Sequence, residues 1–164
     1  MLKIKGLNKS YGKVRALNNL NLQIDEGEFF GFVGPNGSGK TTTMRIISGL
    51  LKADSGSIIL DGIDALKEPK ALKQKIGYMP DFFGVYDNLK AMEYMMFYAS
   101  IYGIVGDTAK KTCLELMELV GLKDKGQTYV DSLSRGMKQR LCLARTLIHD
   151  PKFLILDEPA SGLD

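Results

Sequence analysis

The sequence predicts an α/β fold with a mostly parallel core sheet and an antiparallel β attachment at its N-terminus. Apolar and polar residues alternate over residues 2–7 and 20–24, which is typical of antiparallel strands with one exposed face. Nearly continuous apolar runs at residues 29–33 and 153–156 are typical of strands buried on both faces. Segments with helical periodicity separate the strands, and this alternation favours a parallel sheet.

The remaining elements follow from local patterns. In the two N-terminal strands we expect these side chains to point inward: Leu2, Ile4, Leu7, Leu20, Leu22 and Ile24. Residues 57–60 and 76–79 are expected to form further short strands. Helices are predicted at residues 41–51, 88–104, 108–120 and 134–149, with Gly121 as the C-terminal cap of the third.

Length and composition limit the possible functions. The 164 residues suit one domain, and the net charge of +3, from scattered basic residues, does not indicate nucleic acid as a partner. Cys113 and Cys142 belong to no C-x-x-C pair, so we expect two core thiols in a reducing compartment. The N-terminus does not resemble a signal peptide, and the longest apolar stretch, residues 94–105, is too short to cross a bilayer.

Residues 34–41 fit the pattern G-x-x-x-x-G-K-[ST] between a predicted buried strand and a predicted helix. Glycines let successive backbone N–H groups converge on phosphates, and the N-terminus of the following helix is electropositive. Lys40 is expected to neutralise the β- and γ-phosphates, and Thr41 to bind Mg²⁺. The sequence therefore predicts a P-loop nucleoside triphosphatase whose ATP-binding residues are Gly34, Pro35, Asn36, Gly37, Ser38, Gly39, Lys40, Thr41 and Thr42.

Two carboxylates follow the last predicted strand. The C-terminal end of a strand faces the ligand crevice of an open α/β sheet, so Asp157 is a candidate ligand of Mg²⁺. Glu158 is a candidate catalytic residue that orients or deprotonates the attacking water. An acidic turn without function is the alternative, and the phosphate loop upstream makes it less favoured.

A third segment distinguishes between families of P-loop proteins. It comprises Leu133, Ser134, Arg135, Gly136 and Met137, followed by Gln139 and Arg140. Ser134 is a good N-cap, and Gly136 leaves the start of the helix open to an anion. The segment resembles the L-S-G-G-Q signature of the ATP-binding cassette (ABC) family, with Arg135 in place of the first glycine and Met137 in place of glutamine.

The resemblance covers the whole chain. It implies that Tyr11 stacks on adenine, although an ordinary turn tyrosine remains the alternative. Asp81 takes the place of the glutamine of the family's Q-loop and can reach Mg²⁺ or its water. Residues 161–164 resemble the D-loop. The implied division is a phosphate-loop core with antiparallel strands at 1–80, a helical subdomain at 81–145, and the Asp157 strand with the D-loop at 146–164.

The resemblance also implies an incomplete cassette. The family has a further strand and a switch histidine beyond the D-loop, and the sequence ends at Asp164. The further strand would lie between the predicted strand before the phosphate loop, residues 29–33, and the predicted strand before Asp157, residues 153–156. Buried strands without a neighbour leave unpaired backbone groups. We therefore expect the 164 residues to be the front part of a longer cassette, unstable and weakly active alone.

The implied function is ATP binding and hydrolysis as the nucleotide-binding subunit of an ABC transporter, with an exporter of drug, antibiotic or lipid type favoured. The implied partners are a second cassette, paired head to tail so that its Ser134–Gly136 segment completes the site, and a transmembrane permease subunit at the cytoplasmic face of the membrane. Two alternatives stay open: a soluble ABC ATPase that acts on the ribosome or DNA, and a fragment that binds nucleotide without turnover.

Overall fold

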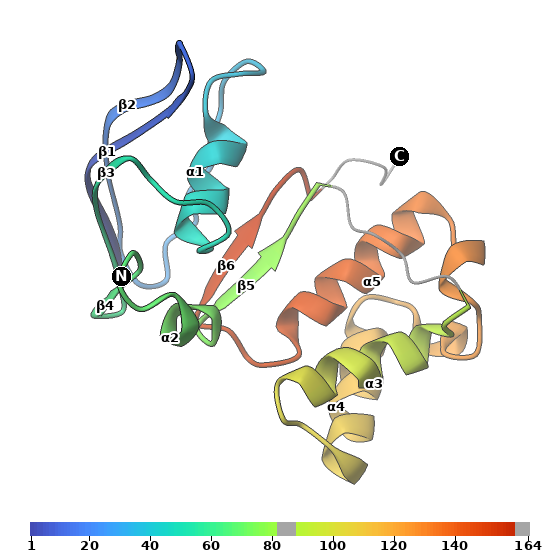
Figure 1. Cartoon of the computed structure of the whole chain (residues 1–164). Helices are drawn as coiled ribbons and strands as arrows, with labels where there is room; N and C mark the ends of the chain where they lie inside the picture. The colour runs from blue at the N-terminus through green and yellow to red at the C-terminus, as the bar shows by residue number, and fades with distance from the viewer. Residues whose placement is uncertain (82–87, 160–164) are drawn as a thin grey trace. The chain divides into compact units, whose positions relative to one another are not determined.

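The computed structural model describes residues 1–81 and 88–159 (Figure 1). The chain divides into two compact units, Met1–Ile76 and Gly77–Asp164, which we call unit 1 and unit 2. Unit 1 contains an antiparallel sheet and two helices, and the described residues of unit 2 form a pair of strands and three long helices. The domain boundaries predicted at residues 80 and 145 stay predictions.

The sheet of unit 1 has four strands in the order β2-β1-β3-β4. The bounds are β1 Leu2–Tyr11, β2 Val14–Ile24, β3 Ser55–Leu60 and β4 Ile63–Asp64, and all neighbouring pairs are antiparallel. The antiparallel N-terminal attachment is thus confirmed. It also includes β3, which the sequence pattern could not assign to this sheet, because a short apolar strand carries no information about its neighbours.

A bulge in β1 explains how one face of that strand is buried. Leu2, Ile4 and Leu7 are all buried, although an even strand would turn Leu7 to the opposite face from Leu2 and Ile4. The register with β2 shifts between Ile4 and Leu7, where Gly6 has a φ of 59°. An extra residue in one strand re-aims the side chains that follow it, so the bulge returns Leu7 to the core face.

The prediction of a buried strand at residues 29–33 is wrong. The segment is irregular, and the side chains of Phe29, Phe30 and Val33 are exposed. No strand among residues 1–81 and 88–159 pairs with it. An extended segment without a hydrogen-bonded neighbour gains nothing from the strand conformation, and an apolar sequence alone cannot supply that neighbour.

Two helices pack in unit 1. Helix α1, Lys40–Ile47, buries Thr43, Met44, Ile46 and Ile47 and contacts β2, and the short α2 spans Pro69–Lys73. Helix α1 ends four residues before the predicted end. Gly49 follows with a φ of 70°, and a left-handed glycine directly after the helix accounts for the early end.

In unit 2, the strands β5, Ile76–Met79, and β6, Phe153–Leu156, lie side by side and run in the same direction (Figure 1). These two strands represent the predicted parallel sheet within the described part of the chain. Strand β6 was expected to be fully buried, and Ile155 is, but Leu154 is 43% exposed. The reason is that the described residues give β6 a neighbour on one side only.

Three helices form the second part of unit 2: α3 Ala91–Ile101, α4 Gly106–Leu119 and α5 Arg135–Leu147. Two short 3₁₀ helices, Lys123–Lys125 and Val130–Ser132, connect α4 to α5. The three helices share one core, which contains Tyr94, Met95, Cys113, Met117 and Leu141. The expected inward positions of Cys113 and Cys142 are confirmed, and burial raises the pKa of both thiols.

Caps mark the ends of these helices as the sequence predicts. Gly121 lies directly beyond the C-terminal cap residue of α4 with a φ of 69°. The Ser134 hydroxyl accepts a hydrogen bond from the Met137 backbone N–H at 3.3 Å, so Ser134 is the N-cap of α5. Among the described residues, the structure contains no helix with the length and apolar character needed to cross a bilayer.

Met117→Ala should destabilise the protein by about 2–5 kcal/mol, because the deleted side chain leaves a cavity in the core of unit 2. Met117 has 0% exposure there. Urea denaturation followed by circular dichroism measures the change in the free energy of unfolding. Leu119→Ala, on the same helix and 70% exposed, is the control and should change it by less than about 0.5 kcal/mol. Equal losses would contradict this core.

Candidate functional site

The phosphate loop of unit 1 is a turn followed by a helix N-terminus. The Ser38 N–H donates to the Pro35 carbonyl at 3.2 Å, which closes the turn, and α1 begins at Lys40. The loop residues 34–38 are exposed. The N-terminus of α1 therefore follows an exposed, glycine-rich turn, as an anion-binding loop requires.

Two glycines of the loop adopt backbone conformations that other residues avoid. Gly37 has a φ of 82° and Gly39 a φ of 91°. A Cβ at Gly39 would also lie 2.6 Å from the Ala16 carbonyl oxygen and 2.8 Å from Leu17 Cδ2, both in β2. The glycine that the motif requires before Lys40 thus has two physical causes at Gly39: its left-handed conformation and the close approach of the loop to β2.

The Lys40 side chain folds back over its own loop. Its ammonium donates to the carbonyl oxygens of Gly34, at 2.5 Å, and of Pro35, at 2.9 Å. These bonds hold the positive charge over the exposed turn. In the same unit, Tyr11 ends β1 with its ring 49% exposed, and the Lys9 ammonium lies 5.7 Å from the ring centroid. An exposed ring at a strand end is available for stacking on a planar ligand.

In unit 2, Asp81 and Asp157 lie beyond the C-terminal ends of neighbouring strands, β5 and β6. The Asp157 N–H donates to the Met79 carbonyl at 2.9 Å, so the strand pairing extends to this residue. Asp157 is buried, whereas Asp81 is exposed. Carboxylate oxygens are ligands that Mg²⁺ prefers, and the side chains of Asp157 and Asp81 fit that chemistry.

Glu158 follows directly with an exposed side chain and a φ of 50°. A left-handed conformation costs a residue with a Cβ about 1–2 kcal/mol. The chain therefore turns sharply between the buried Asp157 and the exposed Glu158. The Gln139 side-chain amide of α5 donates to the Glu158 carbonyl at 3.2 Å.

Helix α5 carries the signature segment at its N-terminus, and polar side chains along its length contact other elements of unit 2. Besides the contact of Gln139, Arg140 donates to the carbonyl of Val120, at the end of α4, at 2.9 Å. Arg145 donates to the hydroxyl of Tyr94, in α3, at 3.0 Å and lies over the ring of Tyr98. Burial raises the pKa of the Tyr94 hydroxyl, although Arg145 opposes the shift.

The predicted residues thus fall into two groups. Tyr11 and residues 34–42 belong to unit 1, and the other predicted residues belong to unit 2, with the D-loop, residues 161–164, outside the described residues. Within unit 2, Leu133 is buried, Ser134 and Arg135 are exposed, and Gly136 and Met137 are half-buried. Sequence reasoning gave no role to the side-chain contacts of Gln139, Arg140 and Arg145. For Gln139 and Arg140 the sequence did carry an indication, because both residues match the family's signature.

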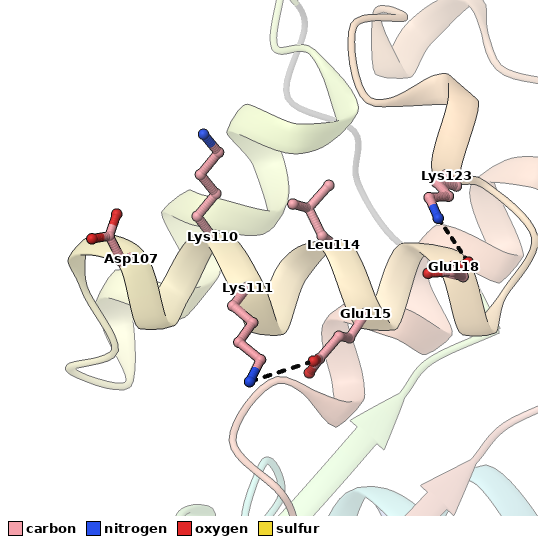
Figure 2. Close-up of a pocket in the computed structure, with 7 residues that line it drawn as sticks. All are labelled: Asp107, Lys110, Lys111, Leu114, Glu115, Glu118 and Lys123. Atoms are coloured by element: carbon pink, nitrogen blue, oxygen red, sulfur yellow. Dashed lines mark hydrogen bonds and ion pairs between the residues drawn. The ribbon is translucent and has the colours of Figure 1, made fainter.

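A separate pocket of about 390 Å³ lies along α4 and contains none of the predicted residues (Figure 2). It is lined by Asp107, Lys110, Lys111, Leu114, Glu115, Glu118 and Lys123. Two ion pairs link its charges, Lys111 with Glu115 at 3.9 Å and Lys123 with Glu118 at 2.8 Å. Such exposed pairs contribute little energy.

The comparison with known proteins defines the class. The model of a family described as "ABC transporter" matches residues 17–161. The chain belongs to the ABC transporter family.

Curated relatives and solved structures agree. The chain is 40% identical over 164 residues to the linearmycin resistance ATP-binding protein LnrL of Bacillus subtilis, covering 100% of this chain and 53% of LnrL. It is 42% identical over 165 residues to the bacitracin transport ATP-binding protein BcrA of Bacillus licheniformis, with the same coverages. The chain therefore spans about half the length of these relatives.

A dimeric structure of MJ0796, a bacterial ABC transporter cassette, superposes with a TM-score of 0.90 at 31% identity, covering 100% of this chain and 76% of that one. This match confirms the predicted P-loop fold of the chain. A second structure of the same cassette, described as post-hydrolysis and bound to ADP and Pi, has the same score and coverage.

Replacing each left-handed glycine of the loop with alanine should separate two causes of strain. Gly37→Ala meets nothing within 4 Å and should cost about 1–2 kcal/mol of unfolding free energy for its backbone conformation alone. Gly39→Ala should cost more, because its Cβ also overlaps the Ala16 carbonyl and forces β2 or α1 to shift. Urea denaturation measures both. Equal costs would contradict the contact between the loop and β2.

Proposed function

We propose that the chain binds and hydrolyses ATP as the nucleotide-binding part of an ABC transporter that exports an antibiotic, drug or lipid. The observation that carries the proposal is the phosphate loop, in which two left-handed glycines precede a helix whose first residue, Lys40, folds its ammonium back over the loop. Family membership supports the reaction. The names of relatives, among them a bacitracin transport and a lantibiotic transport ATP-binding protein, support an antibiotic as the transported compound.

Each predicted residue has a role in this proposal. Residues 34–42 hold the phosphates. The Lys40 ammonium leaves the loop carbonyls and binds the β- and γ-phosphates, and Tyr11 stacks on the adenine. Glu158 orients and deprotonates the attacking water, which needs a carboxylate that is exposed, as this one is. Thr41, Asp157 and Asp81 would hold Mg²⁺, which neutralises phosphate charge when bound.

The signature segment acts on the nucleotide of a second cassette. We propose that Leu133, Ser134, Arg135, Gly136 and Met137 present the start of α5 to that nucleotide, because the exposed N-terminus of a helix attracts phosphate. The dimeric form of MJ0796 supports a second cassette as partner. A transmembrane permease subunit is the other proposed partner, which places the protein at the cytoplasmic face of the membrane.

The proposed division of labour along the chain keeps the predicted boundaries. Residues 1–80 bind the phosphates and adenine, residues 81–145 form the helical subdomain that contacts the permease, and residues 146–164 supply Asp157, Glu158 and the D-loop. Co-purification with a membrane subunit would support this assignment. RNA or DNA binding that weakens steeply with salt would instead favour the soluble ABC ATPase.

Glu158→Gln should lower the ATP turnover of the full-length protein by roughly 100-fold or more and leave ATP binding intact, because the amide cannot accept the proton of the attacking water. Phosphate release measures turnover, and titration with a fluorescent ATP analogue measures binding. Glu115→Gln, a matched change at an exposed carboxylate on α4, should alter neither. Bound ATP with no turnover in the parent protein would favour a nucleotide-binding fragment without catalysis.

A further inference from the structure

The side chain of Gln139 makes a contact that the proposed mechanism does not yet use. Gln139 lies on the buried side of α5 and is 6% exposed. Its amide nitrogen donates to the backbone carbonyl of Glu158 at 3.2 Å, across 19 positions of sequence. A buried side-chain amide that bonds the main chain of a distant segment fixes the position of that segment.

The residue that receives this bond has a conformation that needs support. Glu158 has a Cβ and a φ of 50°, which lies in the left-handed region. Such a conformation persists in a residue other than glycine only where its surroundings over-determine it. Here the chain is held on both sides of the turn, by the bond from the Asp157 N–H to the Met79 carbonyl and by the bond from Gln139 to the Glu158 carbonyl.

Helix α5, which carries the bond from Gln139 to Glu158, is itself held by contacts with two other helices. Arg140, the next residue along, is fixed to the C-terminal end of α4, and Arg145 is fixed to Tyr94 of α3. The Gln139 amide is therefore carried by a helix tied to two others. Groups on rigid elements hold a reacting side chain more accurately than groups on loops.

We infer that Gln139 is a positioning residue for ATP hydrolysis, which holds the Glu158 backbone in the left-handed turn that presents its carboxylate to the attacking water. The inference rests on the proposed role of Glu158. Gln139 acts through Glu158 only, so its loss should lower the rate of the chemical step and leave the affinity for ATP unchanged.

The first test is Gln139→Met in the full-length protein. Methionine keeps the length and volume of the side chain and removes the donor. We expect kcat to fall by ~10-fold with KM for ATP changed by less than ~2-fold, since a misplaced general base affects the transition state alone. Thr146→Val is the control, because it removes a buried hydroxyl of the same helix whose hydrogen bonds are to Cys142, within α5. It should leave kcat unchanged.

The second test combines the change with Glu158→Gln in single-turnover experiments. If Gln139 acts through Glu158, Gln139→Met should change the residual rate of the Glu158→Gln protein by less than ~2-fold. A ~10-fold loss in both backgrounds would overturn the inference, as would an unchanged kcat in the single variant. If Glu158→Gln alone leaves turnover intact, the proposed function itself fails at Glu158 and the inference fails with it.

A third variant covers the case in which Gln139→Met does not fold, as judged by circular dichroism. Gln139→Asn keeps the amide and shortens its reach by one methylene, so it should also lower kcat with little change in KM. A wild-type kcat for this variant would overturn the inference.

Discussion

Buried polar groups need hydrogen-bond partners, and in unit 2 helix α5 supplies them for its neighbours. Arg140 bonds a carbonyl at the end of α4, where the helix leaves its last carbonyls without partners of its own. Arg145 bonds the buried hydroxyl of Tyr94 in α3. Because these contacts lie on successive turns of one helix, α3, α4 and the segment after β6 take their places relative to a single element.

The same helix begins at the signature segment. Ser134 caps it with a side-chain oxygen, so the first turn is fixed by a local bond and does not depend on the rest of the fold. Unit 1 solves a similar problem in a different way. Its helix α1 has no side-chain cap and begins after the left-handed Gly39, whose missing Cβ lets the chain pass close to β2. The start of α5 thus depends on the Ser134 hydroxyl, and the start of α1 depends on the absence of a Cβ at Gly39.

Sequence reasoning succeeded where the cause is local. The cap at Ser134, the left-handed Gly121 and the inward residues of β1 depend on each residue and its immediate neighbours. It failed where the cause is a partner. An apolar run at residues 29–33 has the composition of a buried strand, but a strand also needs a neighbour for its backbone groups.

The same limit applies to the candidate site. The motifs located the phosphate loop, Asp157 and Glu158 because their spacing along the chain carries the signal. The bond from Gln139 spans 19 positions and the bond from Arg145 to Tyr94 spans 51, and no periodic pattern reports such pairs. Two glycines in the sequence mark departures from regular structure: Gly49 ends α1 early, and Gly6 marks the bulge in β1.

The burial of both thiols has a practical consequence. Cys113 and Cys142 lie inside unit 2, and burial keeps them protonated and inaccessible, so these 164 residues offer no accessible native thiol to maleimides. A single cysteine introduced at Lys13, in the exposed turn beside Tyr11, would therefore accept a fluorophore or spin label without removal of the native residues. The hairpin of unit 1 is in this way a ready position for a spectroscopic probe beside the proposed adenine contact.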